Sequence, residues 1–129
     1  MKLTLIKCTH VFRAIQEIEN EKTDFYTAHA LIMAKHELAP HVDFYGQSEK
    51  ELVKEYAIPF ENGAAISEDG QFRLAADKYD EFAAKKAELD HVEVELNLTA
   101  TKLRTVPALK PATLETLMEV FDFSEVSTS

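Results

Sequence analysis

Histidine is the first residue type in this chain that could do chemistry. The chain has five, at His10, His29, His36, His41 and His91. His36 and His41 resemble the helical zinc-protease motif, in which two histidines four residues apart direct both rings toward one metal. Here the spacing is five residues and Pro40 lies between them, so the motif fails. We interpret these histidines as ordinary helix-surface residues, with a metal site of His36, His41 and Asp43 as the alternative.

Carboxylates and the single thiol offer no stronger site. Glu51 and Glu55 are four residues apart on a predicted helix, but they alternate with Lys50 and Lys54, as residues of a solvated face do. Cys8 is followed by Thr9 and His10, and adjacency in sequence is not the geometry of a catalytic dyad. The three glycines are too widely spaced for a phosphate loop. We therefore predict no catalytic, cofactor-binding or metal-binding residue, no cofactor, and a protein that is not an enzyme.

The strongest structural signal is a long amphipathic run from about residue 23 to residue 56. Its apolar residues recur every three or four positions, which predicts one stripe of a helix. They are Leu31, Leu38, Val42, Tyr45, Leu52 and Tyr56. Thr23 is a plausible N-cap, and Pro40 removes a backbone donor and so predicts a kink. We expect one kinked helix over 24–57, with a break at 39–41 or 46–48 as the alternative.

Shorter elements are predicted on both sides of this helix. Residues 2–7 alternate as a strand does, and Thr9 or His10 is expected to open a helix. Residues 65–67 and 71–74 flank a turn and could form a β-hairpin. Residues 77–89 are expected to form a helix that packs against the long helix, so that the two make a helical hairpin. Residues 92–98 alternate clearly as a strand. Residues 102–106 could pair with this strand or with residues 2–7.

The C-terminal part is expected to hold one further helix. Pro111 suits its first turn, and its predicted apolar face is Leu114, Leu117, Met118 and Phe121. The fold class is therefore α+β: a long kinked helix and a helical hairpin packed with a small β-sheet, which we expect to contain the strands at 2–7 and 92–98. We expect residues 1–123 to form a single α+β domain and residues 124–129 to form a flexible C-terminal tail.

Composition and charge limit the partners. The net charge is −9, with 23 Asp and Glu against 14 Lys and Arg, so direct nucleic-acid binding is not expected. No apolar run approaches the length of about 20 residues that a membrane span needs. The lone cysteine fits a reducing cytoplasm. The acidity has two interpretations, solubility or imitation of a nucleic acid that occupies a basic groove on a host enzyme.

Aromatic residues on the long helix are candidates for a protein interface. Phe44 and Tyr45 are adjacent and point to different sides, so either both contact the partner helix of the hairpin, or one of them is left over after core packing. Tyrosine is enriched at interface hot spots. We therefore name Phe44, Tyr45, Glu51 and Glu55 as candidate partner-binding residues.

Several segments together resemble one family. They are residues 48–57 (SEKELVKEYA), 61–63 (ENG), 68–70 (EDG), 78–82 (KYDEF), 92–96 (VEVEL) and 109–115 (LKPATLE). The chain resembles an uncharacterised family of small acidic proteins encoded by phages and prophages of Gram-positive bacteria. The resemblance covers most of the chain and brings no catalytic residues with it. It implies a phage origin and a non-enzymatic accessory role.

The leading hypothesis from the sequence is a phage or prophage accessory protein that acts by protein–protein binding, in virion (tail) structure or assembly. The alternative is an acidic inhibitor, a nucleic-acid mimic, of a host nucleic-acid-processing or defence enzyme. The expected partner is a phage structural protein or a host protein, without nucleic acid or membrane, and a homo-oligomer is compatible with each role. The expected location is the cytoplasm of a bacterial host cell or the virion.

Overall fold

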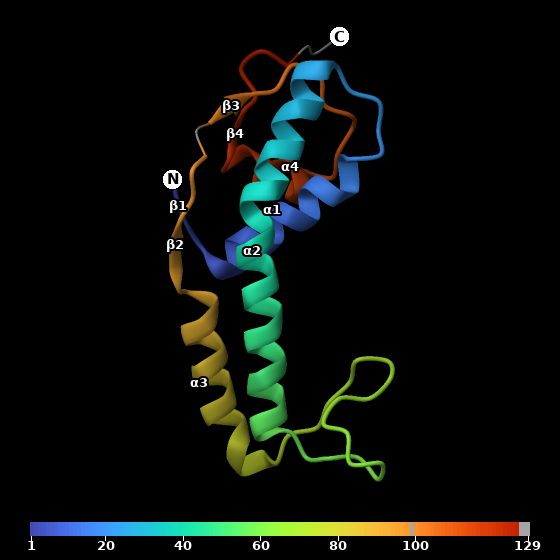
Figure 1. The fold of residues 1–129 in the computed structure, drawn as a ribbon, viewed down its shortest axis with the longest axis vertical. Helices are drawn as coiled ribbons and strands as arrows, with labels where there is room; N and C mark the ends of the chain where they lie inside the picture. Colours follow the sequence, from blue (N-terminus) through green and yellow to red (C-terminus); the bar gives the residue numbers. More distant parts are fainter. Residues whose placement is uncertain (99, 127–129) are drawn as a thin grey trace.

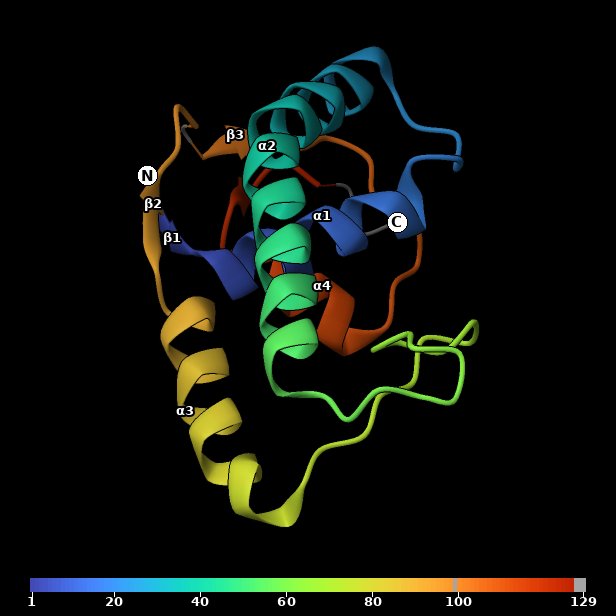
Figure 2. The same cartoon turned by 60° about the horizontal axis from the view of Figure 1, so that its bottom comes forward.

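Two helices that cross each other organise the protein, α1 (Leu5–Ile18) and α2 (Phe25–Tyr56). The computed structural model describes residues 1–98 and 100–126. Figure 1 shows α1 crossing the first half of α2, while the second half of α2 extends away and runs beside α3 (Tyr79–Asp90). A short α4 (Pro111–Met118) packs against α1 on the side away from α2 (Figure 2). The predicted α+β class is confirmed.

Helix α1 begins earlier than the sequence pattern suggested. The strand expected over 2–7 is limited to β1 (Lys2–Thr4), and the helix starts at Leu5, not at Thr9 or His10. Thr4 is the N-cap, and its hydroxyl accepts the backbone N–H of Lys7 at 3.3 Å. The prediction was wrong because Leu5 belongs to the buried helical stripe, although it also continues the alternation of the strand.

Helix α2 is one continuous element, as predicted. Asp24 caps it instead of Thr23, accepting the backbone N–H of Thr27 at 3.1 Å. The helix continues through Pro40 and Gly46, so neither of the alternative breaks is present. Both views show a change of direction about midway along it (Figures 1 and 2), where Pro40 interrupts the hydrogen-bond ladder.

The hydrophobic core lies between α1, the first half of α2 and the C-terminal segment. Most of its members are buried aliphatic side chains from elements far apart in sequence. They include Val11, Ile15 and Ile18 of α1, Leu31 and Leu38 of α2, and Leu96, Leu103, Leu117 and Val120. This core holds the first half of α2 in place and leaves one side of that helix in solvent.

The strands form two small sheets. β1 pairs antiparallel with β2 (Glu93–Glu95), with Leu3 opposite Val94, which confirms the predicted sheet between the first strand and the strand within 92–98. β3 (Thr101–Lys102) pairs in parallel with β4 (Phe121–Asp122). The expectation that residues 102–106 pair with residues 92–98 or 2–7 was therefore wrong. The expectation that Phe121 belongs to the last helix was also wrong, because Phe121 lies on β4, after α4 ends, and enters the core from there.

The chain between α2 and α3 forms a loop, and then a short 3-10 helix, η1 (Ala76–Lys78). The hairpin expected over 65–74 is not formed as two strands. Instead, Ser67 and Gln71 close a turn in which Gly70 has a positive φ of 80°. At the base of the loop, Ala57 bridges Leu74, and the backbone N–H of Ile58 donates to the carbonyl of Arg73 at 2.8 Å.

The C-terminal residues that the structure describes contact the rest of the chain. Val126 packs against the core, and Glu125 forms an ion pair with Lys102 at 3.5 Å. Residues 127–129 of the expected tail lie outside the described residues. No helix in the described part of the chain is long and apolar enough to cross a membrane.

Candidate protein-binding site

An apolar surface runs along the solvent side of α2. It is made of five large side chains, each between 54% and 76% exposed. They are Phe25, Tyr26, Ile32, Met33 and Phe44, which we call the α2 strip. At 100° per residue these positions fall within one third of the helix circumference, so they form one surface. The opposite side of the helix carries the buried Leu31, Ala34 and Leu38.

The α2 strip is ordered by contacts between its own rings and their neighbours. Phe25 meets Tyr26 edge to face, with ring centroids 5.8 Å apart, and stacks on His29 at 6.1 Å. The guanidinium of Arg104 lies 4.1 Å from the centre of the Tyr26 ring. These contacts hold the rings of Phe25 and Tyr26 in place at one end of the strip.

Helix α2 itself contributes little formal charge to this surface. Between residues 25 and 44, Asp43 is the one charged residue among the exposed positions described. Lys35 and Glu37, at the edges of the strip, bind other residues of the same chain. Lys35 is paired with Glu19, and Glu37 accepts the backbone N–H of Asn97. Asp43, beside Phe44 at one end of the strip, is therefore the one side-chain charge of the described α2 positions that a partner covering the strip would meet.

The four residues named from the sequence fall into three environments. Phe44 is exposed and belongs to the α2 strip, whereas Tyr45 is 5% exposed and faces α3. Of the two alternatives, the structure has one ring left over, and Tyr45 is not available as a partner contact. Glu51 and Glu55 are exposed on the charged second half of α2, beyond the strip.

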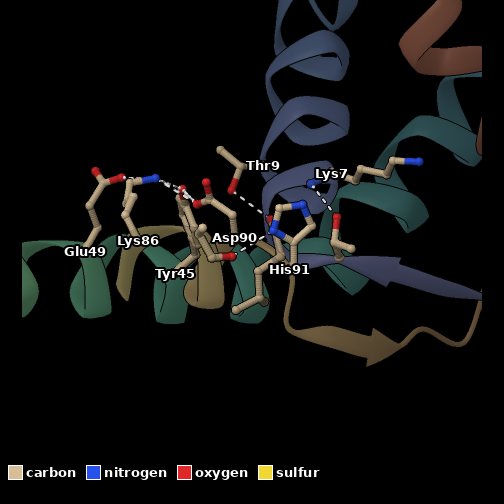
Figure 3. A network of polar contacts seen from close by, with 10 residues as sticks. Lys7, Thr9, Tyr45, Glu49, Lys86, Asp90 and His91 are labelled. Atoms are coloured by element: carbon tan, nitrogen blue, oxygen red, sulfur yellow. Dashed lines mark hydrogen bonds and ion pairs between the residues drawn. The ribbon is translucent and has the colours of Figure 1, made fainter. Parts of the chain in front are cut away.

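Tyr45 belongs to a polar network that joins α2 to α3 (Figure 3). Its hydroxyl donates to Asp90 at 2.5 Å and accepts from Lys86, whose ammonium also contacts Asp90 at 2.8 Å and Glu49 at 3.2 Å. Burial alone would lower the pKa of Lys86, but the hydrogen bonds to Asp90 and Tyr45 outweigh it and raise that pKa. These charges are satisfied by one another, so the network stabilises the helix pair and offers no free acid or base.

The remaining chemical candidates stay apart from one another. His36 and Asp43 are exposed and His41 is half-buried, and no three His, Cys, Asp or Glu of the described residues are grouped so that they could hold a metal ion. Cys8 is fully buried in the core, and burial raises the pKa of its thiol. A small cleft of about 80 Å³ between α1 and α2 is well below the few hundred Å³ usual for a ligand pocket. Two larger hollows, of about 490 and 480 Å³, are open to solvent along the loop between α2 and α3.

Ile32 and Met33 were not among the residues named from the sequence. Their spacing from Phe25 is seven and eight residues, which repeats a helix face, and this was the available signal. Comparison of the chain with protein-family models, curated proteins and solved structures finds no significant match.

Proposed function

We propose that this protein acts by binding another protein through the solvent side of α2. One observation supports the proposal: the α2 strip gathers three aromatic rings, an isoleucine and a methionine on one surface. Its side chains expose roughly 600 Å² in total, at the upper end of the apolar patches that a monomer leaves in solvent. Aromatic residues and methionine are also enriched where protein interfaces form.

The biological setting that we propose is a phage or prophage, following the resemblance of the sequence. In that setting the protein is a non-enzymatic accessory factor in virion (tail) structure or assembly. Its location is then the cytoplasm of the infected bacterium or the virion itself.

The test is an affinity capture from a phage-induced host lysate with three baits. They are the wild-type chain, the strip variant Met33→Asp, and the control Ala84→Asp on the exposed side of α3. We expect phage structural proteins with the wild type and the control, retained through a high-salt wash, and their loss with Met33→Asp. Equal capture by all three baits would contradict a role for the strip.

A second candidate function follows from the distribution of charge. Residues 43–90, which we call the arm, comprise the end of α2, the loop, η1 and α3. The arm holds 12 of the 23 Asp and Glu but 6 of the 14 Lys and Arg, a net charge of −6 out of −9. An acidic projection of this kind suits a basic groove on a nucleic-acid-processing or defence enzyme of the host.

The two candidates predict opposite responses to salt. Binding through the arm should weaken steeply as ionic strength rises, because exposed charges are screened. It should also weaken in the double variant Glu51→Gln, Glu55→Gln and be unaffected by Met33→Asp. A host nuclease or defence enzyme captured with this pattern would favour the acidic inhibitor over the assembly factor.

A further inference from the structure

The α2 strip has an internal symmetry. Tyr26 and Phe44 are 18 residues apart, which is five helical turns, so they lie on the same line along the helix. Met33 lies close to that line, between them. Phe25 and Ile32 follow the other edge of the strip in the same way. The midpoint between Tyr26 and Phe44 is residue 35, close to Met33 and His36.

This spacing makes the surface complementary to itself. When two identical helices pack antiparallel about a twofold axis, residues on one edge meet residues of the same edge in reverse order. With the axis at residue 35, Tyr26 of each copy meets Phe44 of the other. Met33 and His36 of the two copies then meet near the axis.

We propose that the α2 strip is covered by a second copy of this chain, packed antiparallel about a twofold axis near residue 35. The proposal rests on the proposed function in taking the strip as the binding surface, and it names a second copy as the occupant of the strip when no phage partner is bound. Each copy contributes roughly 600 Å², so the pair buries about 1,200 Å², the lower limit of a stable protein interface.

The charge distribution selects the antiparallel arrangement. Each arm has a net charge of −6 and continues from one end of the strip. In a parallel pair the two arms would lie side by side and repel each other, whereas in the antiparallel pair they point to opposite ends. The strip itself brings few charges together, because Asp43 is the one charged side chain among its described exposed positions.

The first experiment measures the mass of the purified chain in solution by sedimentation equilibrium over a range of concentrations. We expect a monomer–dimer equilibrium in the wild type and in Ala84→Asp. Met33→Asp should raise the dissociation constant by about tenfold or more, because it buries an unpaired carboxylate near the axis. Met33 is 54% exposed in the single chain, so the variant should keep the wild-type circular dichroism spectrum.

The second experiment determines the orientation by cysteine crosslinking. His36→Cys should form a disulfide with itself, and an equal mixture of Tyr26→Cys and Phe44→Cys should form a mixed disulfide. Phe44→Cys alone should not crosslink. The wild type is the control, since its own Cys8 is fully buried. A Phe44→Cys homodimer as abundant as the mixed species would overturn the antiparallel arrangement.

Failure of the dimer and failure of the proposed function can be distinguished. A wild type that remains monomeric at all concentrations, while Met33→Asp still abolishes capture of a phage protein, overturns the second copy as occupant and supports the strip as a surface for another protein. A monomer whose capture is unaffected by Met33→Asp overturns both.

Discussion

Replacing Thr27 by valine tests how the start of α2 is joined to the C-terminal segment. Thr27 is fully buried, and its hydroxyl accepts the backbone N–H groups of Arg104 at 3.0 Å and Thr105 at 3.2 Å. The same hydroxyl donates to the N-cap carboxylate of Asp24 at 2.6 Å. Valine keeps the shape of the side chain and removes all three hydrogen bonds. The two backbone donors then face a methyl group.

The expected loss of stability follows from the two orphaned donors. Each costs about 1 to 3 kcal/mol when it is buried without a partner. Arg104 and Thr105 lie in an exposed segment, so water can partly replace the hydroxyl and the lower value applies. We therefore expect Thr27→Val to reduce the free energy of unfolding by about 2 kcal/mol. Thr27→Ser keeps the hydroxyl and should cost clearly less.

Urea denaturation of the wild type, Thr27→Val and Thr27→Ser measures these differences, with an unchanged slope as the check on two-state behaviour. Asp24 provides an independent readout. The hydrogen bond from the Thr27 side chain lowers the pKa of Asp24 to about 2. The stability that this shift contributes is present above the ordinary carboxyl pKa of about 4 and is lost as the pH falls toward 2.

In Thr27→Val the pKa of Asp24, followed by NMR, should return toward the ordinary value, and the acid-dependent loss of stability should become smaller. The reasoning is refuted if the valine variant is as stable as the serine variant at neutral pH, or if the pKa of Asp24 does not move.

Three further changes test other features. Tyr45→Phe should lower the free energy of unfolding by about 1 to 2 kcal/mol in chemical denaturation, because it removes the hydroxyl between Lys86 and Asp90; an unchanged midpoint would contradict this. Pro40→Ala should raise the free energy of unfolding by about 1 kcal/mol, measured in the same way, because it restores a helix donor; destabilisation would show that the bend is required. The Tyr56 hydroxyl donates to the carboxylate of Glu81, which raises the pKa of Tyr56 to about 12. Glu81→Gln should lower the pKa of Tyr56 in an ultraviolet titration, and an unchanged pKa would contradict Glu81 as the cause of the shift.

Elements with a long or clean periodicity were predictable from the sequence. The helical stripe of α2 extends over 32 residues, which is enough for the pattern to outweigh Pro40 and Gly46. The alternation from Val92 to Leu98 located β2, and the first strand was placed in the same small sheet, although the order of its strands could not be derived from the sequence. These signals are local, so they can be recognised in the sequence without knowledge of the rest of the fold.

The features that were missed depend on contacts between distant segments. β3 and β4 have two residues each, too few for any pattern, and they pair because Leu103, which follows β3, and Phe121 of β4 enter the core. The choice of Phe44 over Tyr45 as the exposed ring is decided by where α3 lies. The extent of the α2 strip likewise depends on which side of α2 is covered by α1.

The two ends of the loop between α2 and α3 lie side by side, because Ala57 and Leu74 form a β-bridge at its base. Figure 1 shows the loop projecting from the end of α2, away from the other helices. A segment held in this way can be exchanged as a unit, since its two ends stay neighbours whatever its length. For protein engineering, residues 62–70 are therefore the natural point at which to insert an epitope or a fluorescent reporter, leaving both the α2 strip and the core untouched.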